Sequence, residues 1–402
     1  MPKDLSRVQN VVITMLENRS FDHILGYLGL PDSGHPMAGR IEGIQHAQTY
    51  YAHDTHPPRP ISSPSLTPDP PHERENIDTQ INSILGPMHG FAQSYAASSA
   101  DADPARVMEY VTNHYLPSTD FLARNFAVCD NWFACIPAST LPNRLMAASG
   151  YALVDHTPSG LFQIADNLFN DNPDDLVYDW LSARGISWRI YLGGYSFFFM
   201  QMPRVLKLYE DDVQVQERFR PIDRLIDDFK NGDVAQVTFI EPLYQDDYRR
   251  GTAAATDDHP PASLYGGQRH LKIVYDALSV TAGNEWNNLV AFVTYDEHGS
   301  FFDHVRPPAI RADPPRNAQY ANGFNSLGVR VPAIVVSPFV QAGSLCEQLL
   351  DHTSILKFLG EKFNGGRYTD IVDNRAVQSA SVALDDALLA SGAAGSPPSM
   401  DD

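Results

Sequence analysis

The sequence predicts an α/β fold with a mostly parallel central sheet and helices on both of its faces. Residues Val8–Leu16 form a continuous apolar run, which is typical of a parallel strand buried on both faces of a sheet. Later apolar runs alternate with amphipathic stretches, which is the pattern of strand–helix–strand units. The chain has 402 residues, of which 43% are hydrophobic, so it can form a large core.

The predicted elements alternate along most of the chain. Each predicted strand is a short apolar run, and each predicted helix has apolar residues at helical spacing. The strands are predicted at Val8–Leu16, Ile186–Tyr191, Val234–Ile240, Asn288–Tyr295 and Val329–Ser337. The helices are predicted at Asn76–Tyr95, Pro104–Phe126, Asp175–Arg184, Ile222–Lys230, Gln268–Val280 and His352–Phe363.

Residues 1–378 are expected to form a single catalytic domain. Within it, residues 31–75 are rich in Pro, His, Ser and Asp and lack periodicity, so they are predicted to be a long loop. Residues 379–402 contain mainly Ala, Ser, Asp and Pro, and we expect them to be a flexible tail.

The composition excludes several classes of protein. The net charge of −20 and the pI of about 5.0 argue against nucleic acid or an anionic membrane as a tight partner. No stretch approaches the ~20 apolar residues of a membrane span. The first apolar run lacks a small-residue cleavage site, so we interpret it as a strand and not a signal peptide, as in a cytoplasmic chain. The three cysteines, Cys129, Cys135 and Cys346, are expected to be buried free thiols.

Polar clusters follow two of the predicted strands. Glu17 and Asn18 follow the first strand, and Asp296, Glu297 and His298 follow another. Ligands of parallel α/β sheets bind at the carboxyl ends of the strands, so the two clusters are expected to converge there. Their acids would repel one another unless a cation lies between them. We therefore expect a divalent metal ion, although an ordinary polar loop with one capping Asp is the alternative.

The stretch ACIPASTLPNRL, residues 134–145, places two hydroxyls before a predicted helix. Ser139 and Thr140 would lie at the positive end of the helix dipole, which favours an incoming phosphate. Arg144, one turn later, can form two hydrogen bonds to phosphate oxygens. The alternative is a simple helix N-cap, for which Ser and Thr are preferred.

Two loops present a histidine next to prolines. In PDPPHEREN the histidine is His72, and in TDDHPPAS it is His259. A Pro pair fixes how each imidazole is presented, but such stretches are also common as polar loops. In LDHTSILKFL, helix capping accounts for the polar residues as well as function does. The aromatic run Gly193–Met202 is either hydrophobic core or the wall of a pocket whose ring faces hold a quaternary ammonium.

Taken in order, these motifs resemble one bacterial phosphoesterase family, which groups phosphatidylcholine-type phospholipases C with acid phosphatase A. The match extends from residue 8 to about residue 365, and several long motifs in the correct order make it specific. The matching stretches are ENRSFDHILGYL, DPPHE, GPMHGF, TLPNRL, DDHPPAS, WNNLVAFVTYDEHGSFFDHVRPP, RVPAIVVSPFV and DHTSILKFL.

The resemblance implies an alkaline-phosphatase-like core with a hydroxyl nucleophile beside a metal. Thr140 falls where the family has its Ser or Thr nucleophile. His72 and His259 match the imidazoles that face the phosphoryl group and the leaving group. Asp303 and His304 match a stretch expected to lie at the metal or behind its ligands. The residues that the resemblance identifies as metal ligands are Glu17, Asn18, Thr140, Asp296 and Glu297.

The resemblance also has departures. The family often has Asp where GPMHGF has His89, so we leave His89 outside the site. Larger phospholipase members carry further β-rich domains after the catalytic domain, and members of the family are often exported.

The expected function is therefore a metal-dependent phosphoesterase that works through a phosphothreonyl intermediate. Its substrate would be a small phosphate ester, as for acid phosphatase, or a phospholipid headgroup, as for phospholipase C. One alternative is a non-catalytic ligand-binding module on the same fold. The other is a phosphonate or sulfate ester hydrolase. Sulfatases generally use a modified Cys or Ser in this position, so Thr140 in TLPNR favours direct attack on phosphorus.

Overall fold

The structure is a computed structural model of the chain. Its central feature is one large sheet, which fixes the positions of the segments that carry the predicted site. The residues that the structure describes are 3–47, 56–157, 176–196, 203–245, 254–280, 285–392 and 395–400.

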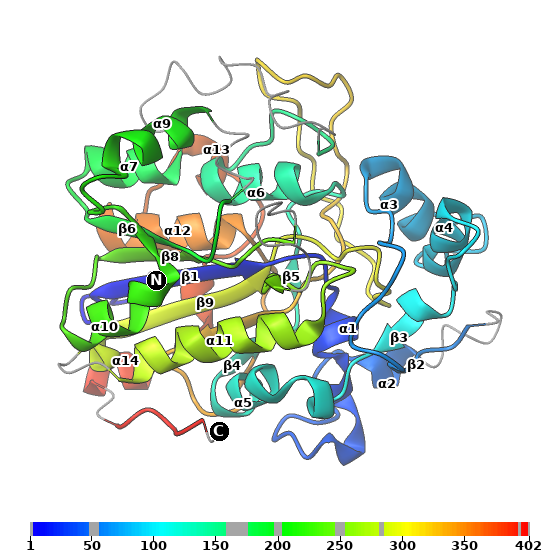
Figure 1. Cartoon of the computed structure of the whole chain (residues 1–402), viewed down its shortest axis with the longest axis horizontal. Helices are drawn as coiled ribbons and strands as arrows, with labels where there is room; N and C mark the ends of the chain where they lie inside the picture. Colours follow the sequence, from blue (N-terminus) through cyan, green and yellow to red (C-terminus); the bar gives the residue numbers. More distant parts are fainter. Residues whose placement is uncertain are drawn as a thin grey trace.

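The central sheet of the described residues has eight strands in the order β11-β4-β10-β9-β1-β8-β6-β7 (Figure 1). All neighbouring strands are parallel except β10, which is antiparallel to both β9 and β4. The predicted α/β class with a mostly parallel sheet is confirmed. The strands are β1 (Asn10–Leu16), β4 (Ala127–Cys129), β6 (Trp188–Leu192), β7 (Phe219–Pro221), β8 (Val237–Glu241), β9 (Leu289–Tyr295), β10 (Ala333–Val336) and β11 (Leu345–Cys346).

Helices cover both faces of this sheet, as Figure 1 shows. One face carries α6 (Thr140–Ser149), α7 (Val177–Ala183) and α12 (Thr353–Phe363). The opposite face carries α5 (Pro117–Asn125), α10 (Leu225–Lys230) and α11 (Leu264–Ser279). Because β1, β8 and β9 are covered on both sides, nearly all of their side chains are buried, which explains their unbroken apolar sequences.

Two predicted helices differ from the structure. The region Asn76–Tyr95 forms two helices, α3 (Arg74–Ile81) and α4 (Phe91–Ser98), because Gly86, Pro87 and Gly90 interrupt the pattern. The region Pro104–Phe126 is helical only in part, since Pro117 starts a new helix, α5, at its first turn. Before it lie η3 (Arg106–Met108), β3 (Glu109–Tyr110) and η4 (Asn113–Tyr115).

The segment predicted as a long loop, residues 31–75, has only short elements in its described part. They are η2 (Pro31–Ser33), α2 (Ile44–Ala47) and β2 (Arg59–Pro60), of which β2 pairs with β3. The segment therefore runs along the surface of the domain as loop for most of its described length.

The segment expected to be a flexible tail differs from that expectation. It contains η8 (Ala380–Ala383) and α14 (Asp386–Ser391), and the side chains of Leu384 and Leu389 are buried in the main core. Asp385 caps α14 by accepting hydrogen bonds from the backbone N–H groups of Ala387 and Leu388. Two buried leucines and a capped helix thus attach this segment to the domain.

The three cysteines are buried and free, as predicted. None of the helices in the described part of the chain has the length and apolar character of a membrane span. The remaining elements of the described chain are α1 (Phe21–Ile24), η1 (Gly26–Gly29), β5 (Trp132–Phe133), α9 (Pro203–Asp212), η5 (Ile222–Arg224), η7 (Trp286–Asn288), β12 (Leu350–Asp351) and α13 (Asp370–Asp373).

Candidate active site

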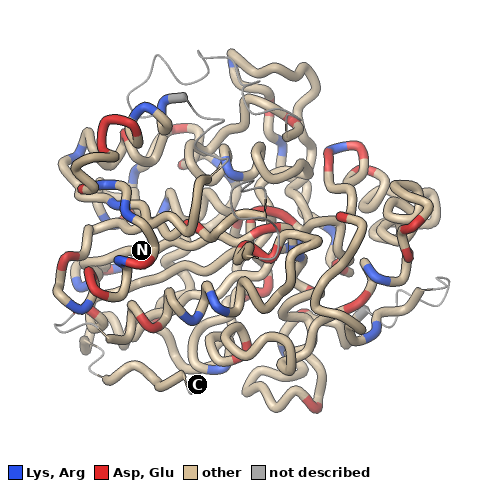
Figure 2. The backbone as a smooth tube through the Cα atoms, viewed as in Figure 1, with Lys and Arg blue, Asp and Glu red and all other residues tan. Residues whose placement is uncertain are grey.

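Acidic residues gather where three neighbouring strands end. Glu17 and Asn18 follow β1, Glu241 ends β8, and Asp296 and Glu297 follow β9. β1 lies between β8 and β9 in the sheet, so these three ends are adjacent. Figure 2 shows a group of acidic residues in the middle of the molecule, near the ends of these strands. The convergence expected from a parallel sheet is therefore present.

The two strand ends beside β1 are joined through the backbone of Asn18. Asn18 has a φ of 59°, in the left-handed region that Asn tolerates better than most residues. Its N–H donates to Asp296 Oδ1 at 3.1 Å. The N–H of Arg19 donates to the carbonyl of Glu297 at 3.1 Å. The turn after β1 is thus fixed directly against the turn after β9.

Arg144 lies among the converging carboxylates and is fully buried. Its guanidinium nitrogens lie 3.1 Å from Glu17 Oε1, 3.3 Å from Asp296 Oδ2 and 3.5 Å from Glu241 Oε2. Burial alone would lower the pKa of Arg144, but Tyr244 and the surrounding carboxylates raise it. We expected this side chain to reach phosphate oxygens, whereas the structure places it on three carboxylates.

Glu297 keeps one carboxylate oxygen without a hydrogen bond. Its Oε2 accepts from the N–H of Gly299 at 2.8 Å, whereas its buried Oε1 has no hydrogen-bond partner in the described chain. Burial and the neighbouring Asp296 raise the pKa of Glu297 to about 8. An unpartnered buried oxygen beside further carboxylate and amide oxygens is the donor chemistry of a divalent cation. Glu297 therefore offers one donor suited to the expected metal. The groups of described residues whose ligand atoms all lie within 4.8 Å of one another are Asp69, His72 and His259, and Asp22, Asp303 and His304.

The two adjacent hydroxyls at the start of α6, those of Ser139 and Thr140, have different hydrogen-bond partners. Ser139 Oγ donates to Glu73 Oε2 at 2.7 Å, so this hydroxyl is directed away from the acids at the strand ends. Thr140 Oγ1 is buried and lies 3.5 Å from Asn18 Oδ1. Of the two, Thr140 is the one that faces the strand ends.

Asn143, which the sequence did not single out, braces the loop before α6. Its side chain accepts from the N–H of Ile136 at 3.1 Å and donates to the carbonyls of Ile136, Ala138 and Ser139 at 2.6 to 3.2 Å. Four hydrogen bonds from one buried amide fix the path of residues 136–139. The Asn of the PNR stretch thus positions Thr140 through the backbone.

The predicted imidazoles, His72 and His259, lie next to each other. Their ring centroids are 5.7 Å apart in an edge-on arrangement. In each ring, Nδ1 lies 2.7 Å from a nearby backbone carbonyl, that of Pro70 or of Pro260. Both Nε2 atoms are therefore directed elsewhere. Together with Asp69, the two rings also form a group whose ligand atoms lie within 4.8 Å of one another.

The pKa values of the two rings are shifted in opposite directions. Burial lowers the pKa of His259 to about 3, with a further contribution from His72. Burial would also lower the pKa of His72, but the carboxylates of Glu297 and Asp69 outweigh it and raise the value to about 9. His72 Nε2 lies 3.1 Å from Asn18 Nδ2 and accepts from it, while the oxygen of the same amide faces Thr140.

Asp257 connects His259 to the first strand end. Its Oδ1 accepts from the N–H of His259 at 3.1 Å, and its backbone carbonyl accepts from the N–H of Glu17 at 2.7 Å. Sequence reasoning missed Asp257 in this role, and it also missed Glu241 and Tyr244. The acidic residue at the carboxyl end of β8 was the available signal for Glu241.

Asp303 and His304 lie in a second cluster that is built around Asp22. His304 Nδ1 lies 2.6 Å from Asp22 Oδ2, and His304 Nε2 lies 2.8 Å from Glu42 Oε1. Arg330 pairs with Asp303 at 2.9 Å and with Asp22 at 3.2 Å. The structure thus groups these residues with Arg330 and Glu42, and Asp22, Asp303 and His304 form a group whose ligand atoms lie within 4.8 Å of one another.

Two further histidines have structural contacts. His298 Nε2 lies 2.7 Å from Gln80 Oε1, so this ring is held by a side-chain amide. His352 Nε2 donates to the carbonyl of Asp296 at 2.7 Å, and its Nδ1 accepts from Trp132 Nε1 at 3.3 Å. His352 therefore supports the turn after β9 from behind.

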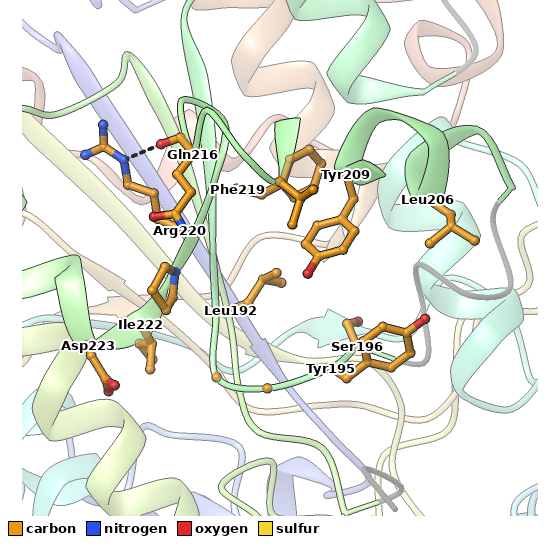
Figure 3. A pocket seen from close by; sticks show the side chains of 14 residues that line it. Leu192, Tyr195, Ser196, Leu206, Tyr209, Gln216, Phe219, Arg220, Ile222 and Asp223 are labelled. Atoms are coloured by element: carbon orange, nitrogen blue, oxygen red, sulfur yellow. Dashed lines mark hydrogen bonds between the residues drawn. The ribbon is translucent and has the colours of Figure 1, made fainter. Parts of the chain in front are cut away.

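A cavity of about 350 Å³ opens beside the ends of β6 and β7. Figure 3 shows the rings of Tyr195 and Tyr209 on one side of it and Asp223 on the other. The N–H of Gly193 donates to the carbonyl of Glu241 at 2.9 Å, so this cavity adjoins the end of β8. Of the predicted aromatic run, residues 197–202 lie outside the described residues.

Comparison of the chain with known proteins identifies one family to which it is similar. The sequence model of the Phosphoesterase family matches residues 8–365. Non-specific phospholipase C3 of Arabidopsis thaliana is 30% identical over 393 residues, which cover 89% of this chain and 70% of that protein. Non-specific phospholipase C6 of the same plant is 31% identical over 89% of this chain and 68% of its own length. Non-hemolytic phospholipase C of Burkholderia pseudomallei is 28% identical and is covered over 55% of its length.

Solved structures show only distant likeness. A Bacteroides thetaiotaomicron structure described in connection with glycosaminoglycan metabolism has a TM-score of 0.46 and 12% identity, over 94% of this chain and 77% of that one. A protein in the alkaline phosphatase superfamily from Vibrio parahaemolyticus has a TM-score of 0.39 and 10% identity, over 64% of this chain and 62% of that one. Similarity at this level carries no argument about the site.

Proposed function

The chain belongs to the Phosphoesterase family and is a hydrolase of phosphoric ester bonds, and we propose that it is a metal-dependent enzyme of the phospholipase C type with a phosphothreonyl intermediate. The observation that carries this proposal is the position of the Thr140 hydroxyl, which faces Asn18 at the edge where Asp296 and Glu297 converge. A nucleophile, an acidic ligand set and two imidazoles then share one edge of the sheet.

The ligand set of the proposed metal is Glu17, Asn18, Thr140, Asp296 and Glu297. A divalent cation held there would supply the positive charge that the oxygens of a transferring phosphoryl group need. Glu297 Oε1, which is buried and lacks a hydrogen bond in the described chain, is the clearest free donor of the set. Arg144 balances part of the remaining negative charge and keeps Glu17 and Asp296 together.

In the first proposed step, the Thr140 hydroxyl, whose pKa a bound cation would lower, loses its proton to solvent, and Oγ1 attacks phosphorus in line with the leaving group. The bond between Thr140 and phosphorus forms as the bond from phosphorus to the leaving alkoxide breaks. His72 gives its proton to that alkoxide, because its Nδ1 is held by the Pro70 carbonyl and its Nε2 is directed toward Asn18 and the site. His259 stays neutral, and its Nε2 can accept a hydrogen bond beside the leaving group.

In the second step, water cleaves the phosphothreonine. His72 is now neutral and takes a proton from the attacking water, as microscopic reversibility requires of the group that protonated the leaving group. The bond between phosphorus and Thr140 Oγ1 breaks, and the departing threonine oxygen takes a proton from solvent, which restores the hydroxyl. Asn143 and its four hydrogen bonds keep the start of α6 in place through both steps.

The proposed substrate is a phosphodiester of the phospholipid headgroup class. The support comes from the relatives, which are named phospholipases C and match this chain over most of its length. The cavity beside β6 and β7 adds apolar and aromatic surface next to the site. Preferred cleavage of a phosphate monoester or of a sulfate ester, or no cleavage of any ester, would each indicate a different activity. The test therefore includes these substrates.

The test compares hydrolysis of p-nitrophenylphosphorylcholine, p-nitrophenyl phosphate and p-nitrophenyl sulfate, with and without a chelator. We expect the wild type to cleave the phosphodiester best and to lose activity on chelation. Thr140→Ala should lower kcat by at least about 10³-fold, since removal of a covalent nucleophile leaves only residual catalysis. Wild-type enzyme that is acid-quenched during turnover of the phosphodiester should carry phosphorylcholine on the peptide that contains Thr140.

Thr140→Ser is the matched control, because it keeps a hydroxyl at the same position and should retain a large part of the rate. Full activity of Thr140→Ala would refute the assignment of the nucleophile. Preference for the monoester would identify a phosphatase, and preference for the sulfate a sulfate ester hydrolase. If no ester is cleaved with any added divalent cation, a non-catalytic binding module becomes the better description.

A further inference from the structure

The carboxylate of Glu73 contacts Ser139 and Thr157, which lie in two segments far from Glu73 in the sequence. Its Oε2 accepts a hydrogen bond from Ser139 Oγ at 2.7 Å. Both of its oxygens lie 3.3 Å from the backbone N–H of Thr157, which donates to them. Glu73 is the N-cap residue of α3, yet its side chain makes no capping bond to that helix. The side chain instead accepts hydrogen bonds at the start of α6.

The first turn of α6 depends on this contact. Ser139 is the N-cap residue of α6, but its side chain does not cap the helix. The capping oxygen comes from Thr157, whose Oγ1 accepts from the N–H of Leu141 at 3.1 Å. Ser139 Oγ lies 3.0 Å from Thr157 Oγ1 and also accepts from the N–H of Thr157 at 2.9 Å. Glu73, Ser139 and Thr157 thus form one hydrogen-bonded unit around the residue before the proposed nucleophile.

The same unit reaches the proposed leaving-group side of the site. Glu73 directly follows His72, whose ring lies against Asn18 and His259. The next residue, Arg74, pairs with Asp155 at 2.9 Å, two residues before Thr157. The segment that carries His72 is therefore attached to the start of α6 through Glu73, and to the segment that carries Thr157 through both Glu73 and Arg74.

We propose that Glu73 is a positioning residue that sets the distance between the Thr140 hydroxyl and the His72 imidazole. This inference rests on the proposed function, in which these two groups act on opposite sides of the phosphoryl group. Glu73 is not a catalytic residue, because its oxygens bind Ser139 and Thr157 and leave the Thr140 hydroxyl to Asn18. Near-attack geometry is sensitive at this scale, since a displacement of about 1 Å can cost ~10²-fold in rate.

The experiment measures kcat and KM of Glu73→Gln and Glu73→Ala with a p-nitrophenyl phosphoester that the wild type cleaves. Glu73→Gln keeps one accepting oxygen but turns an NH₂ group toward the donors, so kcat should fall about 10-fold. Glu73→Ala should lower kcat about 10²-fold. KM should change less than about 2-fold in both, because no group that binds the substrate is removed.

Two variants of Thr157 test the same hydrogen-bonded unit without changing Glu73. Thr157→Val removes the oxygen that caps Leu141 and should lower kcat as Glu73→Ala does, whereas Thr157→Ser keeps that oxygen and should restore the rate. The double variant Glu73→Ala with Thr157→Val should be little worse than either single one, since the two residues act as a unit. Glu75→Gln, on an exposed position of the same helix, is the matched control and should keep the wild-type kcat.

Unchanged kcat in Glu73→Ala would overturn the inference, as would additive effects in the double variant. A parallel rise in KM would do the same, because it would indicate a loss of substrate binding. The proposed function has its own separate test in Thr140→Ala. An inactive Thr140→Ala beside a fully active Glu73→Ala would leave the proposed function standing and remove only the role of Glu73.

Discussion

Several carboxylates share one guanidinium at the edge of the sheet. Arg144 contacts Glu17, Glu241 and Asp296, while Glu297 lies beyond its reach with an unpartnered oxygen. Buried charges are tolerated only when they are paired or bind a metal. One arginine cannot neutralise four acids, and burial together with the nearby Asp296 raises the pKa of Glu297. The same imbalance is what would drive a divalent cation into the site.

The second cluster predicts a pH-dependent stability. Burial would lower the pKa of His304, but Asp22 outweighs it and raises the value to about 9, against about 6.5 for an unfolded chain. Because the folded state holds the proton more tightly, the stabilisation is complete below about pH 6.5 and is lost as the pH rises through 9. His304→Gln should destabilise the protein by ~2 kcal/mol at pH 6 and much less at pH 10.

Urea unfolding of the wild type and His304→Gln between pH 6 and 10 measures this effect. The control is His114→Gln, because His114 is exposed on η4 and its loss should leave the pH profile of the wild type unchanged. An equal free-energy difference between wild type and His304→Gln at pH 6 and pH 10 would contradict a charged His304 between Asp22 and Glu42.

Single residues differ in how far the sequence could place them. Glu17, Asn18 and Asp296 follow apolar strands, so strand direction alone predicted that they meet. Asp303 and His304 are close to Glu297 in sequence, yet the chain turns away after Phe301 and carries them to Arg330. That turn depends on packing between distant segments, which strand and helix patterns do not contain.

At the scale of elements, the turn after β9 decides the shape of the site. Gly299 has a φ of 58°, and a Cβ at this position would lie 2.1 Å from the carbonyl oxygen of Asn18. Gly299→Ala should therefore push Asn18 away from Asp296. We expect a loss of at least about 10-fold in kcat/KM and a destabilisation of ~3 kcal/mol, which combines backbone strain with the steric clash.

Gly365→Ala is the matched control for this substitution. Gly365 has a φ of 62°, but a Cβ there would meet no atom within 4 Å. Its substitution carries only the backbone cost of ~1 kcal/mol and should leave kcat/KM unchanged. Thermal unfolding and steady-state kinetics of both variants separate the two contributions. Equal behaviour of the two alanine variants would show that Asn18 does not depend on the close approach of Gly299.

The elements also show where sequence patterns are sufficient. β1, β8 and β9 were predicted because strands covered on both faces need unbroken apolar runs. β4 and β11 were missed, since strands of two or three residues leave no periodic signal. The reversed direction of β10 also could not be predicted, because an apolar run of four residues is the same in either direction.

At the scale of the whole molecule, the site joins segments from all parts of the chain. Its groups come from residues 17–18 after β1, from residue 72 before α3, from residues 140–144 of α6, from residues 241, 257 and 259, and from residues 296–297 after β9. Nothing in a local stretch could therefore define the site, and the long-range order of the motifs was what predicted it. A ligand that binds all of these segments together must also stabilise the fold that brings them together.

Chelation should therefore lower the stability of the wild type. A cation at 100 times its dissociation constant adds about 2.7 kcal/mol to the free energy of unfolding, because it binds only the folded state. Thermal unfolding with a chelator, and with Mg²⁺, Mn²⁺, Ca²⁺ or Zn²⁺ added singly, measures the shift and identifies the cation that produces it. The melting temperature should rise with the concentration of that cation.

Glu297→Gln provides the decisive comparison for this shift. With the cation removed, the raised pKa of about 8 keeps Glu297 mostly protonated at neutral pH, so a neutral amide should match the stability of the chelated wild type. With cation present, Glu297→Gln should gain much less stability, since it has lost an anionic ligand. His304→Gln should keep the full gain, because its cluster is built around Asp22 and Arg330. An equal gain in the wild type and in Glu297→Gln would place the cation elsewhere in the molecule.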